Sequence, residues 1–260
     1  MILVMGILNV TPDSFSDGGE YFDTQKAIAR GLEMIEEGAT IIDVGGESTK
    51  PGVDRVSMDE ELTRVIPVIH ALAKTGAIVS VDTMRAEVAA LAVAAGARII
   101  NDVSGGLADL AMHATAAALK TQYICMHWRG QSKDMDALAN YDDVVTEVIH
   151  ELTKQVAAAL LAGIEPTKLV IDPGLGFAKN QEQNWEILRN IDKFKELGFP
   201  ILVGGSRKRF LGGDRPTDRE SASIALTTWL ATKDIWGVRT HTVKPHVDAI
   251  KLVKLVGQDL

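Results

Sequence analysis

The sequence is poor in several features that mark secreted, membrane and disulfide-stabilised proteins. Its only cysteine in 260 residues is Cys125, so no intramolecular disulfide is possible, which fits a reducing compartment. No run of about 18 apolar residues occurs, so no membrane-spanning helix is expected. The apolar stretch 1–8 has no Lys or Arg before it and is interrupted by Asn9, so no export signal is expected. These absences predict a cytoplasmic protein.

Positive charge is also scarce. Lys and Arg total 27 against 35 Asp and Glu, a net charge of -8. A surface of that sign repels polyanions, so nucleic acid and acidic membranes are not expected as partners. Hydrophobic residues make up 46% and charged residues 24%, close to the globular average. We expect a folded globular protein.

Familiar metal and nucleotide motifs are missing as well. Neither His-x-x-x-His nor Cys-x-x-Cys occurs, so a structural zinc is not expected. The P-loop spacing is absent, and the run 174–176 lacks the third glycine of a dinucleotide fingerprint. A Mg²⁺ held mainly by substrate phosphates would leave little trace in a sequence, and Asn9 is its predicted protein ligand.

Apolar runs of strand length recur along the chain, and segments with helical periodicity separate them. The runs are Leu3 to Leu8, Ile41 to Val44, Ile78 to Val81, Arg98 to Ile100, Gln122 to Met126, Leu169 to Ile171, Pro200 to Val203 and Ile235 to Val238. Eight units of strand and helix, about 32 residues each, predict an α/β protein of the (β/α)8 TIM barrel class. We find no linker and expect one domain over residues 1–260.

Capping signals support these helix boundaries. Three segments carry the capping-box pattern, namely Ser57 with Glu60, Asn180 with Gln183 and Thr217 with Glu220. Five helices are expected to end in a left-handed glycine, at Gly38, Gly76, Gly96, Gly163 and Gly198.

In a TIM barrel the site is built at the carboxyl ends of the strands, so polar residues there are the candidates. They are Asn9, Glu47, Ser48, Thr49, Lys50, Asp82, Asn101, Asp102, His127, Arg129, Asp172, Ser206, Arg207, Lys208, Arg239 and His241. All eight strands contribute to this set, so we expect one polar mouth.

Two subsets of these residues suggest a ligand. Asp82, Asn101 and Asp172 can together donate and accept the hydrogen bonds of a flat heterocycle, although each alone could instead cap a helix. The second subset holds the cationic and anion-binding groups Lys50, Arg207, Lys208, Arg239 and His241. It would attract an anionic substrate, the alternative for any one of them being simple solvation.

The loops resemble the motifs of the dihydropteroate synthase family. The matching segments are NVTPDSFSDGG at 9–19, GGESTKPG at 45–52, VDT at 81–83, IINDVSG at 99–105, DPGLGFAKN at 172–180 and GGSRKRFLG at 204–212. They extend from the first strand to the last. RPTDRESA and WGVR resemble actinobacterial members most.

The resemblance implies an activity and assigns roles to the polar residues at the carboxyl ends of the strands. The family joins 6-hydroxymethyl-7,8-dihydropterin pyrophosphate to p-aminobenzoate, and releases pyrophosphate in folate biosynthesis. By resemblance, the pterin would be held by Asp82, Asn101, Asp172, Lys208, Arg239, Met126 and Phe177. The pyrophosphate and its Mg²⁺ would meet Asn9, Thr49, Lys50, Arg239 and His241, with Asn9 as the metal ligand.

The same resemblance implies a second substrate subsite. p-Aminobenzoate would lie among Phe15, Thr49, Pro51, Ser206 and Lys208, with Ser206 at the N-terminal end of the seventh helix. Sulfonamides would compete there, because they share the aniline ring. The family is usually a homodimer, which the resemblance implies here too.

Three positions depart from the family pattern. Lys50 and Thr242 stand where Arg and Asp are usual, which predicts weaker anion affinity, and Ala178 replaces a common Gly. The departures at Lys50 and Thr242 leave a non-catalytic pterin-binding paralogue as an alternative. A pterin-dependent methyltransferase would share the pterin-binding residues Asp82, Asn101 and Asp172 but would not need the loops at 9–19 and 45–52 in this form. A sugar-phosphate isomerase barrel would explain neither the Asp82, Asn101 and Asp172 set nor those loops.

Overall fold

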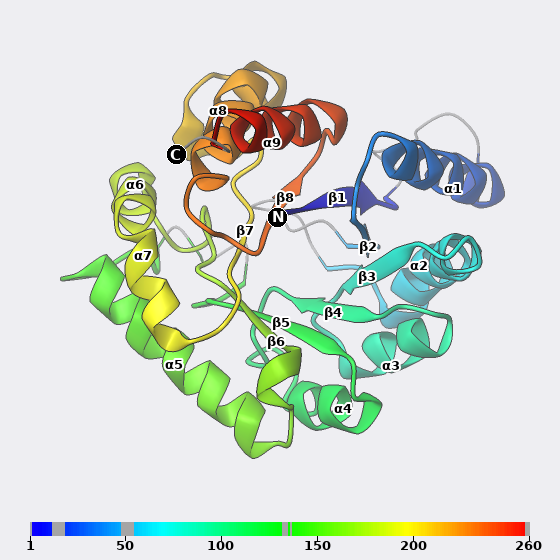
Figure 1. Ribbon diagram of the computed structural model, residues 1–260. Coiled ribbons are helices and arrows are strands. Elements are labelled where there is room, and N and C mark those ends of the chain that lie inside the picture. The colour runs from blue at the N-terminus through cyan, green and yellow to red at the C-terminus, as the bar shows by residue number, and fades with distance from the viewer. Residues whose placement is uncertain (1, 12–18, 48–54, 132–134, 136, 258–260) are drawn as a thin grey trace.

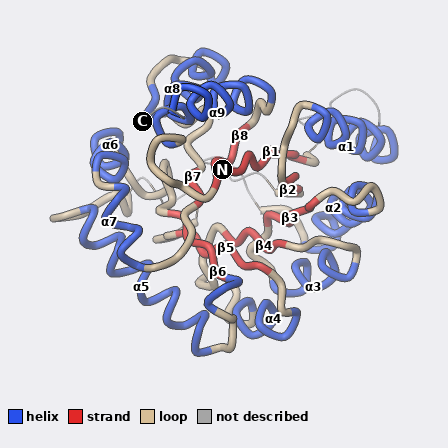
Figure 2. The backbone as a smooth tube through the Cα atoms, in the orientation of Figure 1, coloured by secondary structure: helices blue, strands red, loops and turns tan. Residues whose placement is uncertain are grey.

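The computed structural model describes all residues except 1, 12–18, 48–54, 132–134, 136 and 258–260, and the side chains of 19–23 are likewise not described. In this part of the chain, eight parallel strands form one sheet in the order β6-β5-β4-β3-β2-β1-β8-β7. The sheet curls into a barrel ringed by helices (Figure 1), with strands inside and helices outside (Figure 2). An isolated bridge between Ile171 and Ile201 is the remaining link between β6 and β7. The predicted (β/α)8 fold is confirmed.

The strands follow the predicted runs closely, but the seventh and eighth start two residues later than predicted. They are β1 Leu3–Asn9, β2 Ile41–Gly45, β3 Ile78–Asp82, β4 Ile99–Asp102, β5 Gln122–Met126, β6 Leu169–Asp172, β7 Leu202–Val203 and β8 Gly237–Thr240. The eighth strand starts two residues later than predicted, because Leu3 at the start of β1 pairs with Gly237. Arg239 therefore lies inside β8 rather than after it.

The helices that surround the barrel are α1 Gly19–Glu36, α2 Met58–Ala73, α3 Ala86–Ala94, α4 Met112–Leu119, α5 Val144–Leu161, α6 Gln181–Arg189, α7 Ile191–Phe194, α8 Glu220–Leu230 and α9 Lys244–Val256. The five predicted glycine caps all have positive φ, and a Cβ on Gly96 would lie 2.6 Å from that of Ala73. Ser57 accepts a hydrogen bond from the Glu60 N–H, but the Glu60 carboxylate pairs with Arg64, so only half of the predicted capping box is present.

One of the other two predicted capping boxes is present and one is not. Asn180 and Gln183 form the complete reciprocal pair at the start of α6. The box predicted at Thr217 is wrong, because a 3₁₀ turn occupies 216–219, where Arg215 and Asp218 cap each other, and α8 begins only at Glu220.

Apolar residues fill both faces of the sheet. The barrel interior holds a layer made of Met5, Ile41, Ile99, Ile124, Val170 and Leu202, all at most 2% exposed. The alternate residues of the strands pack outward against the helices in one large core. Because side chains alternate along a strand, the residues two positions after this interior layer point into the barrel near its carboxyl end.

None of the described helices combines the length and the apolar character needed to cross a membrane.

Candidate active site

Three of the predicted polar side chains stand at the carboxyl end of the barrel. Asp82 ends β3, Asp172 ends β6, and Asn101 is the residue before the end of β4. Ile99 and Val170 belong to the interior layer, so alternation turns Asn101 and Asp172 inward one step above it. All three side chains are buried. Polar groups therefore replace the apolar filling where the barrel opens.

Arg239 joins this polar layer across the barrel. Its Nε donates to Asp43 Oδ2 at 2.6 Å, and its Nη2 donates to Asp82 Oδ2 at 2.5 Å. Asn101 Nδ2 donates to the same Asp43 oxygen at 3.0 Å. Side chains from β2, β3, β4 and β8 thus form one hydrogen-bonded floor.

Two glycines keep the space above this floor open. A Cβ on Gly45 would lie 3.4 Å from that of Asp82, and a Cβ on Gly204 would lie 3.7 Å from Asp172 Oδ2. Their neighbours would touch any side chain placed there.

Asp43 is a member of the floor that the sequence reasoning missed. That reasoning considered the residues directly after each apolar run, whereas Asp43 lies within β2. The available signal was a carboxylate two positions after Ile41, hence on the interior face of a buried strand. Asp43 Oδ1 and the hydroxyl of Ser80, its register partner on β3, are buried and have no hydrogen-bond partner among the described residues.

The charges of the floor are strongly coupled. Burial raises the pKa of Asp82 to about 7, the Arg239 charge opposes this shift, and the Asp43 charge adds to it. Burial disfavours the charged form of Arg239, yet the two carboxylates hold its pKa above the usual range. Burial also raises the pKa of Asp172, against the Lys208 charge and the Gly174 N–H. The floor can therefore exchange protons with a ligand near neutral pH.

An apolar cluster lies beside the polar groups. It consists of Met84, Val103 and Met126, with Ala108 and Phe177 packed against them. Lys208 Nζ lies 4.2 Å from the centroid of the Phe177 ring and donates to the Leu175 carbonyl. Burial lowers the pKa of Lys208 to about 8, against the attraction of Asp172. A flat ring would find an apolar face and polar edges here.

Ser206 and His241 form a pair at the mouth. The Ser206 hydroxyl lies 3.0 Å from His241 Nδ1 and also accepts the His241 backbone N–H at 3.2 Å. Burial, followed by the charge of Arg239, lowers the pKa of His241 to about 3, so the ring is neutral at pH 7. His241 was expected among the cations, and it is instead a neutral hydrogen-bonding group. Ser206 is not at a helix N-terminus, because α8 begins only at Glu220.

Two further residues of the mouth, Arg207 and Thr242, form hydrogen bonds to Glu220. Arg207 Nε donates to its carboxylate at 2.7 Å, and the Thr242 hydroxyl donates to its other oxygen. Arg207 is thus already paired, contrary to its expected place among the anion-binding cations. Thr242 contributes to the packing of α8 against the loop after β8.

Three of the polar residues predicted at the mouth, Asp102, His127 and Arg129, turn away from it. Asp102 accepts hydrogen bonds from Tyr123 Oη and from backbone N–H groups of the loop after β4. His127 Nε2 and Arg129 Nε both contact Glu151 of α5, each at 2.9 Å. These three residues tie loops to the barrel wall.

The two loops that carry the remaining predicted contacts, 9–19 and 45–52, fall largely outside the described residues. Phe15, Thr49, Lys50 and Pro51 are all among the undescribed positions. The last described residue before the second gap, Glu47, is held by Arg55 and Arg85 at 2.8 and 3.2 Å.

Asn9, the predicted metal ligand, ends β1 beside Gly45 of β2. It stands two and four positions after Ile7 and Met5, so it points into the barrel mouth. Within the described ranges no three His, Cys, Asp or Glu side chains come together as a metal site. The chain thus offers one amide oxygen, which suits a Mg²⁺ bound mostly by substrate oxygens.

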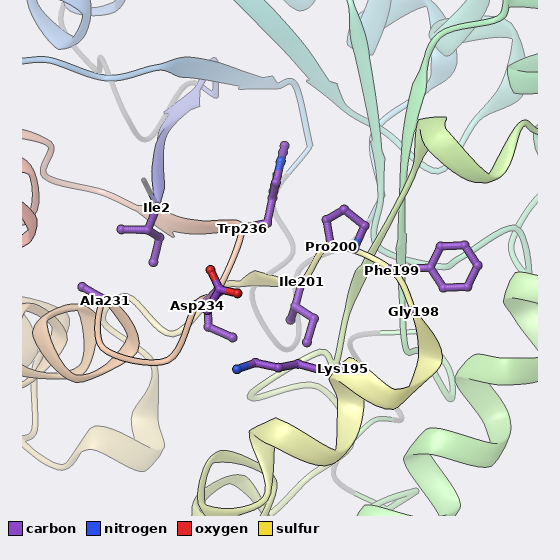
Figure 3. A pocket seen from close by; sticks show the side chains of 10 residues that line it. Ile2, Lys195, Gly198, Phe199, Pro200, Ile201, Ala231, Asp234 and Trp236 are labelled. Atoms are coloured by element: carbon purple, nitrogen blue, oxygen red, sulfur yellow. The ribbon is translucent and has the colours of Figure 1, made fainter.

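A cavity of about 630 Å³ opens at the opposite, amino-terminal end of the barrel (Figure 3). Ile2, Pro200, Ile201 and Trp236 line it, and Lys195 and Asp234 stand at its edge. It lies away from the polar floor, and the ends of strands that form it usually serve stability in barrels. We therefore place the candidate site at the carboxyl end.

Comparisons with known proteins identify relatives of this chain. A family model described as pterin binding enzyme matches residues 5–241. The chain is 48% identical over 262 residues to the dihydropteroate synthase of Mycobacterium leprae, covering 97% of this chain and 92% of that protein.

Solved structures are similar over almost the whole chain. A structure of Xanthomonas albilineans dihydropteroate synthase with 4-aminobenzoic acid is 42% identical, with a TM-score of 0.93 over 99% of this chain and 93% of that one. Another, in complex with 7,8-dihydropteroate, is 40% identical, with a TM-score of 0.89 over 99% and 94% of the two chains.

Proposed function

This chain belongs to the pterin binding enzyme family, and from that premise we infer that it catalyses the dihydropteroate synthase reaction. It condenses 6-hydroxymethyl-7,8-dihydropterin pyrophosphate with p-aminobenzoate, giving 7,8-dihydropteroate and pyrophosphate. The observation that carries this function is the buried floor of Asp82, Asn101 and Arg239, with Asp172 beside it. The relatives it resembles are synthases, so a methyltransferase or a non-catalytic paralogue is not favoured.

We propose that the pterin ring lies on this floor. Asp172 Oδ1 already accepts the Gly174 N–H at 2.7 Å, which leaves Oδ2 to accept from the ring's N–H and amine groups. Asn101 and Asp82 take further positions of the ring edge, and Arg239 stacks beneath it. Met126 and Phe177 supply apolar contact, and Lys208 donates a charged hydrogen bond.

The leaving pyrophosphate meets Arg239, His241 and Asn9 at the mouth in this proposal, with Thr49 and Lys50 from the second loop. His241 is neutral, so it contributes a hydrogen bond, and the charge comes from Arg239 and Lys50. Asn9 would be the protein ligand of a Mg²⁺. When bound, the ion would neutralise charge on the diphosphate.

p-Aminobenzoate, we propose, binds outside the pterin, against Ser206 and Lys208, with Phe15, Thr49 and Pro51 from the loops. Its carboxylate is a suitable acceptor for the Ser206 hydroxyl and the Lys208 ammonium. Sulfonamides share the aniline ring and would compete for the same subsite.

The chemistry needs positioning and charge stabilisation rather than a nucleophilic side chain. The bond from the exocyclic methylene carbon to the diphosphate oxygen breaks, the aniline nitrogen forms the new C–N bond, and its proton passes to solvent. The pterin ring stabilises the carbon cation, while the fixed charges of Arg239 and the floor favour departure of the anion. The Ser206 hydroxyl contacts both Nδ1 and the backbone N–H of His241. It therefore links the two loops and does not act as an attacking group.

We further propose that residues 1–260 act as a single cytoplasmic domain and that two copies form a homodimer. The support for the dimer is a set of exposed apolar side chains on the neighbouring helices α8 and α9, the patch residues Trp229, Leu252, Leu255 and Val256. Small molecules are the ligands, and neither nucleic acid nor membrane is a partner.

The test of the proposed function combines calorimetric titration of the pterin pyrophosphate with a pyrophosphate-release assay that includes p-aminobenzoate. The parent chain should bind the pterin and release pyrophosphate only when the aniline is present. Asp172→Asn should bind the pterin at least about a hundredfold more weakly, because its amide presents a donor where the ring also donates. The exposed Asp142→Asn is the matched control. If Asp172→Asn binds within about threefold of the parent, the proposed pterin pocket is wrong.

A further inference from the structure

The loop after β6, residues 173–178, has an unusual backbone. Gly174, Gly176 and Ala178 all have positive φ, at 69°, 75° and 46°. Such a loop is held in place by its hydrogen bonds rather than by regular secondary structure. Lys179, which the proposed function does not use, donates two of those bonds, more than any other side chain does among the described residues.

Lys179 is buried and its ammonium is saturated. Nζ donates to the carbonyls of Gly174 and Phe177, each at 3.1 Å, and lies 3.0 Å from His127 Nδ1. An ammonium has three N–H groups, and here each has an acceptor. Lys179 therefore fastens both ends of the loop segment that carries Phe177.

His127 connects Lys179 to helix α5 on the outside of the barrel. Because Nδ1 accepts from Lys179, the ring is the neutral tautomer that carries its proton on Nε2 and donates to Glu151 at 2.9 Å. Burial, together with the Lys179 charge, lowers the pKa of His127 to about 4, which agrees with that tautomer. Arg129 holds the Glu151 carboxylate with Nε and Nη2, so the chain of contacts ends on α5.

The same loop carries the groups that face the proposed ligand. Lys208 donates to the Leu175 carbonyl and lies over the Phe177 ring, and the Gly174 N–H holds the Asp172 carboxylate. Gly174 thus contacts Asp172 through its N–H and Lys179 through its carbonyl. A change at Lys179 is transmitted to the pterin pocket through one peptide segment.

We propose that Lys179 is a positioning residue for the pterin, held by His127 and Glu151, and that its charged form keeps the loop of Phe177 and the Asp172 carboxylate ready for the ring. This rests on the proposed function only for the identity of the ligand. Lys179 contacts neither the ring nor the reacting atoms; it acts through the backbone of the loop.

The proposal has a pH signature. The groups facing Lys179 are His127 of the β5 loop, Glu151 of α5, Arg129, Asp172 and Lys208. Burial, then the charge of Lys208, lowers the pKa of Lys179 to about 7, and Asp172 opposes the shift. Above that pH the amine loses one donor and the charge that favours ionised Asp172. The contribution of Lys179 to pterin affinity should therefore fall as the pH rises from 6 toward 8, opposite in sign to the contribution that ionisation of Asp82 makes over the same range.

The test compares Lys179→Met with the parent and with Lys154→Met, an exposed lysine on α5. The pterin dissociation constant is measured by calorimetry at several pH values from 6 to 9, beside the Michaelis constant for p-aminobenzoate. Lys179→Met should bind pterin about tenfold more weakly than the parent at pH 6, and this difference should shrink to about twofold or less at pH 8, where the parent's amine is largely neutral. The p-aminobenzoate constant should change less than about twofold, because most of its subsite lies outside the loop 173–178.

Glu151→Gln is the second variant, because its side chain is 31% exposed and the fold tolerates change there better. It should weaken pterin binding in the same direction with a smaller effect. If Lys179→Met keeps the parent's affinity and pH dependence, or if it does not fold and Glu151→Gln binds like the parent, the positioning role is overturned. A parent that binds pterin but forms no dihydropteroate contradicts the proposed function alone, and one that binds no pterin contradicts both.

Discussion

The two oxygens of the Asp43 carboxylate have different surroundings, and this difference decides what a substitution does. Oδ2 accepts from Arg239 and Asn101, whereas Oδ1 has no partner among the described residues. An asparagine can place its oxygen at the first position and its NH₂ at the second. Asp43→Asn therefore removes a charge and keeps both hydrogen bonds.

We predict that Asp43→Asn flattens the pH dependence of pterin binding on the acid side. The Asp43 charge raises the pKa of Asp82, so its removal lets Asp82 ionise at lower pH. Ionisation of a carboxyl with a pKa near 7 contributes about a tenfold fall in the pterin dissociation constant from pH 6 to pH 8, opposite to the contribution of Lys179. The variant should reduce the Asp82 contribution to about two- or threefold, so its ratio of the dissociation constants at pH 6 and pH 8 should be about three- to fivefold smaller than the parent's. Calorimetric titration at both pH values measures it.

Ser80→Ala is the control for this prediction. Ser80 is the register partner of Asp43, and its buried hydroxyl likewise has no hydrogen-bond partner among the described residues. The substitution removes no charge, so the ratio of the dissociation constants at pH 6 and pH 8 should stay that of the parent. Equal ratios in Asp43→Asn and the parent would show that Asp82 does not titrate in this range.

At the scale of elements, the loop after β6 shows how a local departure from the family pattern acts. Ala178 is held at a φ of 46°, where a Cβ is unfavourable and glycine is not. The hydrogen bonds of Lys179 to Gly174 and Phe177 oppose relaxation of this strain. We therefore expect alanine at this position to weaken the fold relative to the glycine that is common there.

We predict that Ala178→Gly stabilises the chain by up to about 1 kcal/mol, since relief of the left-handed strain outweighs the extra entropy of the unfolded chain. The midpoint and slope of urea unfolding measure the change. Ala162→Gly is the matched control, because Ala162 ends α5 with a φ of -72° and has no strain to relieve. It should destabilise slightly. A lower midpoint for Ala178→Gly than for Ala162→Gly would contradict the prediction.

On the scale of the whole molecule, the barrel is least regular between β6 and β7. β7 contains only Leu202 and Val203, and the link to β6 is the bridge between Ile171 and Ile201. The helices that follow in the chain, α8 and α9, pack against each other beside β7 and β8 (Figure 1). Their outer faces carry the patch proposed for dimerisation.

We predict that Leu252→Lys with Leu255→Lys converts the dimer to monomers. These side chains are 59% and 67% exposed, so a lysine there costs nothing in the isolated chain but is buried at the proposed interface. Sedimentation velocity should show a dimer dissociation constant raised at least about a hundredfold. Leu161→Lys, at a side chain 91% exposed on α5, is the control and should leave the dimer intact. A parent that sediments as a monomer, or a double variant that remains dimeric, rules out this interface.

Local sequence patterns were enough to predict the barrel and much of its mouth. Apolar runs and helical stripes have fixed periods, and a left-handed cap such as Gly96 favours glycine whatever surrounds it, so these signals survive in a single sequence. The search for polar residues at the carboxyl ends of the strands then indicated Asp82, Asn101 and Asp172, because parallel strands end at one edge of the barrel. The capping box predicted at Thr217 shows the limit of such local patterns, because Arg215 and Asp218 cap the turn there instead.

Only the tertiary structure decided which polar residues meet. Asp43 and Arg239 are 196 positions apart in sequence and meet because β2 and β8 flank β1. The same closure sends Asp102, His127 and Arg129 away from the mouth, toward partners behind the strands. A side chain's direction follows from strand alternation, but its partner depends on which strands and helices lie opposite. That depends on the packing of the whole barrel, which no local pattern encodes.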